Sequence, residues 1–183
     1  MTEARSRRVF FALWPDDEST AHLSALAHSL ASGGGRVMRP AALHLTLAFV
    51  GAVTPSELAQ LEEIGAGVRA EAFDLSLDHL GFWPQRGILW AGCLQPPVAL
   101  CRLVESLVAG LHAAGFCIAQ GHGSALVPHL TLTRRAHCAS LPQLATPIRW
   151  RVSEFALVES QLQPSPASYT TLASFPLDKA DAG

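Results

Sequence analysis

HLTLAFVG at residues 44–51 and HLTLTRRA at residues 129–136 begin with the same four letters, 129 − 44 = 85 positions apart. A shared four-residue word is weak support for a repeat in a leucine-rich chain. The segments around each copy therefore decide whether the shared tetrapeptide marks an internal repeat. In both copies Leu alternates with His and Thr, which predicts a strand with leucines on one face and polar side chains on the other.

The same order of elements leads to each copy. The apolar runs RVFFALWP (residues 8–15) and GILWAGCL (residues 87–94) read as buried strands. Each is followed by a helix with an apolar stripe and then by glycine, at residues 33–35 and at Gly115. The distance from the opening strand to the histidine is similar in the two halves: it is 34 residues from Phe10 to His44 and 40 residues from Leu89 to His129. We therefore expect an internal duplication, about 8–83 and 87–177, within one domain spanning 1–183.

The remaining segments complete a mixed pattern of helices and strands. Residues 55–68 are predicted to form a helix, because Thr54 and Glu57 have the spacing of a capping box around Pro55. Residues 73–83 alternate like one half-buried strand, and residues 152–162 and 168–177 resemble a hairpin. We therefore expect a chain that contains both helices and strands.

Composition narrows the class of protein. Of 183 residues 49% are hydrophobic and 15% charged, which indicates a compact globular protein and not a disordered one. No apolar run reaches the roughly 20 residues needed to cross a bilayer, and the N-terminus lacks a secretory signal, so we expect a cytoplasmic protein without a membrane partner. A net charge of −2 disfavours a protein that tracks along nucleic acid, but it permits recognition of one nucleotide or one chain end.

The cysteines predict neither a disulfide framework nor a zinc site. They lack any CxxC spacing and are expected to be free thiols, two of them in the core: Cys93, Cys101, Cys117 and Cys138. We expect no metal and no other cofactor.

Two His-x-Thr strands make chemical sense as a pair. Residues two apart on a strand share a face, so His44 lies beside Thr46 and His129 beside Thr131. If the halves pack about a pseudo-two-fold axis, both faces meet in one cleft. Histidine exchanges protons near neutral pH, and two of them on opposite sides of a phosphorus atom could act as general acid and general base. The threonine hydroxyls could bind the phosphoryl oxygens.

A lone histidine on a strand is more often structural than catalytic. That interpretation applies to the six others, His22, His28, His79, His112, His122 and His137. His44 and His129 differ because each is paired with a threonine inside a repeated unit.

With these motifs in view, the chain resembles the 2H phosphoesterase superfamily, and within it the bacterial and archaeal RNA 2′,3′-cyclic phosphodiesterases, also called the 2′-5′ RNA ligase family. RVFFALWPD is similar to the opening strand, RPAALHLTLAFVG and VPHLTLTR to the two motifs, and GILWAGC to the strand that opens the second half. LVESQL and Tyr169 are similar to the closing hairpin. The lead-in GSALVP is less basic and less aromatic than in many members, which leaves RNA contacts from that segment open.

The resemblance implies that the fold class is α+β and that the fold is bilobal, with two pseudo-symmetric halves whose antiparallel sheets line a central cleft and whose helices pack outside. It implies metal-independent hydrolysis of a terminal 2′,3′-cyclic phosphate on RNA to a 2′-phosphomonoester, with reversible 2′-5′ ligation as a possible reverse reaction. His44 would be the proton donor and His129 the proton acceptor, while Thr46 and Thr131 would bind phosphate. The residues alone do not distinguish the two histidine roles.

Further substrate contacts are expected at the rim of the cleft. Arg134 lies five residues after His129, hence on the opposite face of a regular strand, and reaches the phosphate only if the strand ends or bends. Arg39 and Tyr169 are rim candidates. Phe49 could stack on a base, although a core position is favoured.

Two other functions stay open. The first is a related enzyme acting on a small cyclic phosphate or a cyclic nucleotide. The second is a module that binds nucleotide phosphates without turnover, although pure binding would favour Arg or Lys over paired histidines. The expected partner is an RNA 3′ end or a small cyclic-phosphate nucleotide, and we expect a monomer with no obligate protein partner.

Overall fold

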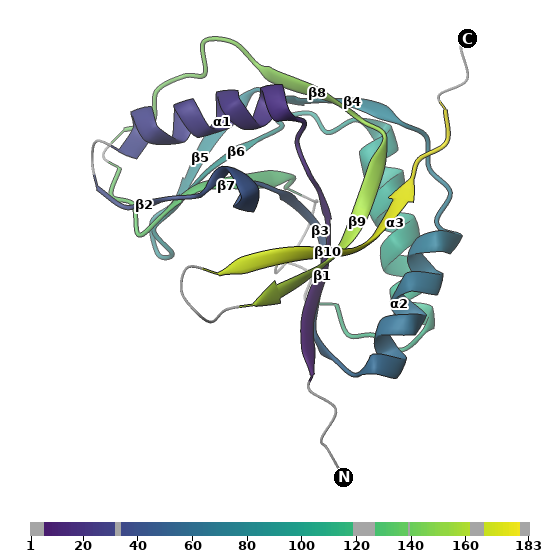
Figure 1. Cartoon of the computed structure of the whole chain (residues 1–183). Coiled ribbons are helices and arrows are strands. Elements are labelled where there is room, and N and C mark those ends of the chain that lie inside the picture. The colour runs from purple at the N-terminus through teal and green to yellow at the C-terminus, as the bar shows by residue number, and fades with distance from the viewer. Residues whose placement is uncertain (1–5, 32–33, 119–126, 139, 162–166, 180–183) are drawn as a thin grey trace.

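The computed structural model describes residues 6–31, 34–118, 127–138, 140–161 and 167–179. Within these ranges the protein is α+β, which confirms the predicted class (Figure 1). Its helices are α1 (Asp17–Leu30), α2 (Pro55–Gly67), α3 (Val98–Ala113) and the short 3-10 helix η2 (Pro40–Ala42). Its strands are β1 (Arg7–Leu13), β2 (Arg36–Val37), β3 (Leu45–Val53), β4 (Phe73–Leu77), β5 (His79–Trp83), β6 (Ile88–Gly92), β7 (His129–Arg134), β8 (Ile148–Val152), β9 (Glu154–Gln161) and β10 (Ser168–Pro176).

The two HLTL segments are neighbours at the centre of the main sheet. In the part of the chain that is described, this sheet runs in the order β10-β9-β1-β3-β7-β6-β5, with β2 also paired to β7. The strands β3 and β7 are antiparallel and pair at Leu45 and Leu130, the residues that follow the two histidines. Strands β4 and β8 form a separate two-stranded sheet.

The elements on either side of this central pair correspond. Strand β1, which opens the first half of the sequence, pairs with β3, and β6, which opens the second half, pairs with β7. The helices cross over: α1 follows β1 but packs against β7 and β8, whereas α3 follows β6 but packs against β3. Figure 1 shows α1 on one side of the molecule and α2 and α3 together on the other. This correspondence supports the predicted duplication, which stays a prediction.

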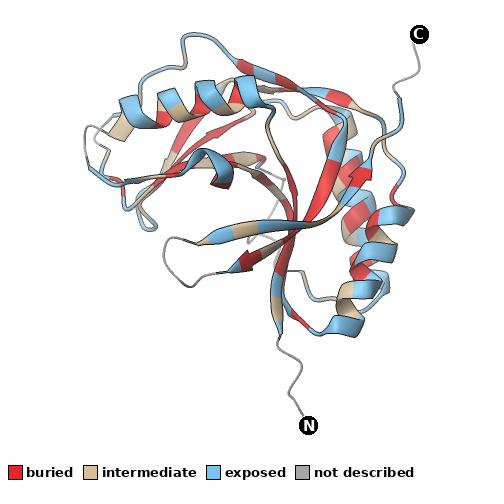
Figure 2. Cartoon of the chain, viewed as in Figure 1, coloured by how far each residue is buried: buried red, intermediate tan, exposed pale blue. Residues whose placement is uncertain are grey.

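Strand β1 separates two apolar clusters. Val9, Phe11 and Leu13 belong to the main core, which also contains the buried stripes of the helices. Phe10 and Ala12, on the opposite face, belong to a smaller cluster that is packed against partly buried aromatic rings, those of Trp14, Phe49 and Tyr169. Figure 2 shows the buried residues concentrated in the strands and on the inner faces of the helices. The smaller cluster forms a hydrophobic support on the face where the polar residues of β3 lie.

Helix α2 begins as its sequence predicts. The Glu57 amide donates to Thr54 Oγ1 at 3.3 Å and the Thr54 amide donates to Glu57 Oε2 at 2.7 Å, which completes the capping box. None of the helices in the described ranges is both long enough and apolar enough to cross a membrane.

The predicted single strand over residues 73–83 is wrong, because the chain changes sheet at Asp78. Strand β4 pairs with β8, whereas β5 pairs with β6. At the break the Asp78 amide donates to the Gly92 carbonyl at 3.0 Å, and Asp78 Oδ1 accepts the Leu94 amide at 3.0 Å. Strand β8 is also absent from the sequence prediction, although its buried Ile148, Trp150 and Val152 alternate with exposed arginines.

The expectation that two cysteines are core residues is wrong as well. Cys93, Cys101 and Cys138 are half-buried free thiols and Cys117 is exposed. On α3 the reason is geometric, since Leu100 and Leu103 occupy the buried stripe and Cys101 lies beside it. Among the described residues, no group of three or more His, Cys, Asp or Glu side chains could hold a metal ion.

Candidate active site

Alternation along the two central strands presents both histidines to one face. Leu45 and Leu130 are fully buried, whereas His44 and His129 are half-buried on the other side. Because Leu45 faces Leu130 in antiparallel register, the residues on either side of this pair bring each histidine towards the threonine of the other strand.

One cavity of about 210 Å³ collects the predicted residues. His44, Thr46, His129 and Thr131 all line it, together with Arg134. The sequence prediction that two distant His-x-Thr pairs share a space therefore agrees with the geometry. The catalytic roles of these residues stay proposals, and we call this space the catalytic cavity.

Both imidazoles are held by the same backbone contact. Nδ1 of His44 lies 2.9 Å from the Ala42 carbonyl, and Nδ1 of His129 lies 2.9 Å from the Val127 carbonyl. Since a carbonyl oxygen only accepts, each Nδ1 carries the hydrogen and donates it. In the neutral ring Nε2 is then the basic nitrogen, so this atom is left to take up or release a proton at the cavity.

Aromatic rings differ around the two histidines. The His44 ring contacts Phe10 and Tyr169, each with centroids 4.9 Å away, and Trp14 at 5.4 Å. The His129 ring instead lies against Trp83 at 4.6 Å and Trp90 at 6.1 Å. These contacts restrict ring rotation and exclude water from one side of each imidazole.

Burial lowers the pKa of both histidines. For His44 desolvation is the main cause, the nearby positive charges of Arg134 and His129 add to it, and the pKa falls from 6.5 to about 4. For His129 desolvation also comes first, followed by the charges of Arg134 and Arg86. Hydrogen bonds to the backbone carbonyls act in the opposite direction in both cases. Both rings are therefore mainly neutral at pH 7 when no anion is bound.

A bulge in β7 brings Arg134 to the catalytic face. Leu89 of β6 pairs with Thr133 and Trp90 pairs with Thr131, which leaves Leu132 unpaired between them. As a result Leu132 and Thr133 are both buried and the alternation shifts by one residue. Arg134 thus lines the same cavity as the two histidines, which meets the condition that the strand must bend.

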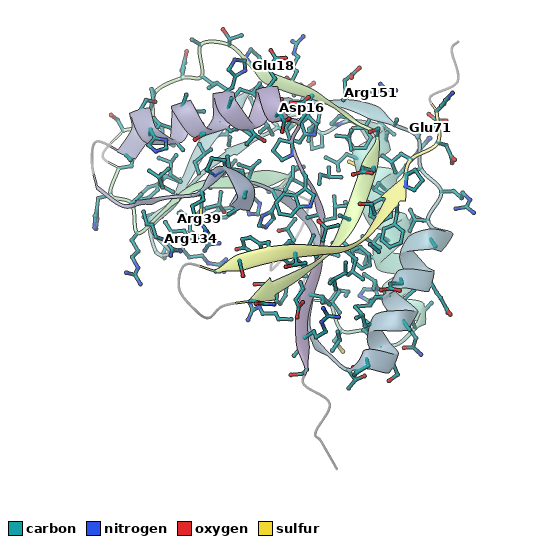
Figure 3. The ribbon with its side chains drawn as sticks, in the orientation of Figure 1. Asp16, Glu18, Arg39, Glu71, Arg134 and Arg151 are labelled. Atoms are coloured by element: carbon teal, nitrogen blue, oxygen red, sulfur yellow. The ribbon has the colours of Figure 1, made fainter. Side chains whose placement is uncertain are left out.

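A larger cavity of about 560 Å³ adjoins the catalytic one. His44, Thr46 and Arg134 line both of them. The two rim candidates, Arg39 and Tyr169, line the larger cavity. Phe49 lines it too and is half-buried, so the favoured core position is wrong for this residue. Figure 3 shows Arg39 and Arg134 labelled close together beneath η2, well away from Arg151.

The chain is similar in sequence to proteins of known function. A family model described as LigT-like phosphoesterase matches residues 13–90. The RNA 2′,3′-cyclic phosphodiesterase of Escherichia coli is 30% identical over 173 residues, covering 93% of this chain and 97% of the relative. The protein of the same name from Thermus thermophilus is 32% identical over 179 residues, covering 93% and 90%.

The chain belongs to the LigT-like phosphoesterase family.

Solved structures of the family agree with this assignment. The crystal structure of E. coli LigT in its apo form superposes with a TM-score of 0.86 and 28% identity, over 96% of this chain and 99% of that one. The crystal structure of LigT complexed with 3′-AMP gives the same TM-score and identity, over 95% and 99%. The family resemblance inferred from the sequence is therefore confirmed.

Several residues at this LigT-like site were not predicted from the sequence as site residues. Trp83 and Arg86 line the catalytic cavity beside His129, and Arg8 and Arg36 line the larger one. Arg86 belongs to the turn between β5 and β6, in the segment WPQRG, where a charged residue gives no periodic signal. The lead-in GSALVP falls mostly outside the described residues.

Proposed function

We propose that this LigT-like phosphoesterase hydrolyses a terminal 2′,3′-cyclic phosphate on RNA to a 2′-phosphomonoester, without a metal ion. The observation that carries the proposal is that both His-x-Thr pairs line one small cavity. Two imidazoles and two hydroxyls can transfer protons and bind phosphoryl oxygens. The names of the curated relatives support the RNA substrate.

The surroundings of the two histidines favour one assignment of roles. The larger cavity, which has room for a nucleoside, adjoins His44 and not His129. A nucleoside lying there would turn its leaving 3′ oxygen towards His44, so we assign His44 as proton donor. Water would then attack phosphorus from the opposite side, where His129 accepts its proton. Thr46, Thr131 and the Arg134 guanidinium would stabilise the charge on the phosphoryl oxygens.

Reversible 2′-5′ ligation would use the same groups. A 5′-hydroxyl in place of water would attack phosphorus, give up its proton to His129 and form a 2′-5′ bond, while the 3′ oxygen takes a proton from His44. The alternatives of a small cyclic phosphate as substrate and of a binding module require the same cavity. They differ in turnover and in substrate size, both of which can be measured.

The test is turnover of a short RNA ending in a 2′,3′-cyclic phosphate, in the presence of a chelator. We expect wild type to yield a 2′-phosphate end. His44→Ala and His129→Ala should each lose about 10²–10⁴-fold in rate, because each removes one proton-transfer group. Thr46→Ala should lose about 10–100-fold, the effect of one hydrogen bond to a charged group.

The matched control is His22→Ala, which removes an exposed histidine on α1. Circular dichroism should show every variant folded, and His44→Ala should bind the product within several-fold of wild type. Loss of binding together with turnover would argue against an acid–base role. Loss of wild-type activity in chelator would contradict the metal-free reaction.

A further inference from the structure

The catalytic cavity is too small for a whole nucleotide. Its volume of about 210 Å³ lies below the roughly 300–1,000 Å³ of typical small-molecule sites. It can hold the cyclic phosphate and the ribose oxygens attached to it. The rest of the substrate must extend into the adjoining cavity of about 560 Å³, whose near end is the shared wall of His44, Thr46 and Arg134.

Three more arginines line the larger cavity but not the catalytic one. Arg8 comes from β1, Arg36 from β2 and Arg39 from the residue before η2. Among the described residues that line this cavity there is no Asp or Glu. In the described part of the chain the ion pairs within 4.0 Å join Arg7 to Glu159 and Arg151 to Asp74, so none of these three guanidiniums has a carboxylate partner. In a protein with a net charge of −2, this is a local excess of positive charge.

Two neighbouring arginines on β1 differ in whether a carboxylate neutralises their charge. Arg7 donates two hydrogen bonds to the Glu159 carboxylate, at 3.0 and 2.8 Å, and is thereby neutralised. Arg8 points to the other face, where its guanidinium lies 4.6 Å from the centre of the Phe49 ring. A flat cation stacked on an aromatic ring keeps its N–H groups available at its edge for a phosphate.

The two walls of the cavity therefore carry the groups that bind a single-stranded nucleic acid, which are guanidiniums and an aromatic ring. Arg8 and Phe49 lie on one wall, from β1 and β3, and Arg36 comes from β2, which pairs with β7 rather than with those strands. Guanidiniums bind backbone phosphates and flat groups stack on bases. A mononucleotide cyclic phosphate has no second phosphate to occupy this region.

We propose that Arg8 and Arg36 form a subsite for the internucleotide phosphate that precedes the terminal nucleotide, with the Arg8–Phe49 pair beside the penultimate base. This rests on the proposed function and deepens it, because it makes an RNA strand of at least two nucleotides the preferred substrate over a small cyclic phosphate.

The experiment compares hydrolysis of a mononucleotide 2′,3′-cyclic phosphate with that of a trinucleotide ending in the same group. We expect wild type to have the higher kcat/KM on the trinucleotide. Arg8→Ala and Arg36→Ala should each lower the trinucleotide-to-mononucleotide ratio of kcat/KM about tenfold, the weight of one charge-assisted hydrogen bond. The dependence of log KM on log salt for the trinucleotide should become shallower by about 0.7 for each arginine removed.

Two arginine controls remove the same charge elsewhere. Arg151→Ala acts on the separate β4–β8 sheet, and Arg135→Ala acts at another hollow, which is lined by neither His44 nor His129. Both should keep the wild-type ratio. Equal kcat/KM on the two substrates in wild type, or a loss of the ratio in Arg135→Ala instead of Arg8→Ala, would overturn the subsite while the proposed function stands. Absence of turnover on both substrates would overturn the subsite and the proposed function together.

Discussion

At the scale of single residues, two histidines with the same backbone contact lie among different rings. Each Nδ1–H is held by a carbonyl two residues earlier, which fixes the tautomer that leaves Nε2 basic. His44 is enclosed by Phe10, Trp14 and Tyr169. Because this enclosure costs the charged imidazolium its hydration, it favours release of the proton from His44, the acid of the proposed pair.

The pH dependence of the rate follows from these pKa values. The reactive form has His44 protonated and His129 neutral, and the pKa of His44 is lowered to about 4 while that of His129 lies below 6.5. The bell-shaped profile of kcat/KM, which reports the free enzyme, should therefore have its maximum below pH 6.5. The profile of kcat should extend to higher pH, because a bound phosphate anion raises the pKa of His44.

Steady-state kinetics over pH 3.5–9 on a cyclic-phosphate oligonucleotide would measure both profiles. The substrate has no group of its own that titrates near the phosphorus in this range. A value of kcat/KM that rises without a maximum through neutrality would contradict the two-histidine scheme.

At the scale of elements, the β5–β6 hairpin supports His129 through an indole ring. Gly81 of β5 faces Trp90 of β6, and the Trp90 ring covers the position where a side chain on Gly81 would be. The same ring contacts Trp83 at 5.2 Å, and both indoles contact His129. A glycine remote from the cavity thus sets the position of a catalytic candidate.

Gly81→Ala should affect both stability and turnover. Its methyl group would collide with the Trp90 ring, and such overpacking costs about 1–3 kcal/mol in the free energy of unfolding. The displaced ring should also move His129 and lower kcat. Urea denaturation and single-turnover rates would measure the two effects.

Gly67→Ala is the control for this change. Gly67 ends α2, and a methyl group there meets no atom within 4 Å. This variant should keep its activity and be as stable as wild type or more so, because alanine favours the helix by about 0.5–1 kcal/mol. If Gly81→Ala behaved in the same way, the support of His129 by Trp90 would be disproved.

At the scale of the whole molecule, the crossed helices join the two parts of the sheet around the site. The helix that follows β1 packs on β7, and the helix that follows β6 packs on β3. Each HLTL strand is therefore packed against a helix of the other sequence half and paired with the other HLTL strand. This arrangement supports our proposal that residues 8–83 and 87–177 are duplicated units, and it makes burial of the histidines a property of the complete fold.

Because His44 is buried only in the complete fold, the free energy of unfolding should fall in mild acid. The pKa of His44 is about 4 when folded and near 6.5 when unfolded, so the unfolded chain binds the proton first as pH falls. The stabilisation is complete above pH 6.5 and is lost between pH 6.5 and 4, by about 3 kcal/mol. His44→Asn should remove most of this loss.

Urea denaturation at pH 4.5 and pH 7 would measure the difference for wild type, His44→Asn and the exposed-histidine control His22→Asn. The control should lose as much stability as wild type in acid. An equal loss in His44→Asn would show that other groups cause the acid sensitivity.

The sequence by itself determined the local structure and the chemistry of this protein. Alternation in HLTL predicted two strands with His and Thr on one face, and the spacing of Thr54 and Glu57 predicted the start of α2. These patterns are readable because each depends on residues only two to four positions apart. The family resemblance, which rests on the same motifs, gave the fold class.

Only the tertiary structure decided which distant segments complete the site. The β7 bulge that returns Arg134 to the cavity depends on pairing with β6, and the change of sheet at Asp78 depends on β8 and β6 as separate partners. Only the pairing of β1 with β9 decides that Arg7 binds Glu159, while Arg8 has no carboxylate partner among the described residues. Such features arise from contacts between residues far apart in the chain, and no local period in the sequence encodes them.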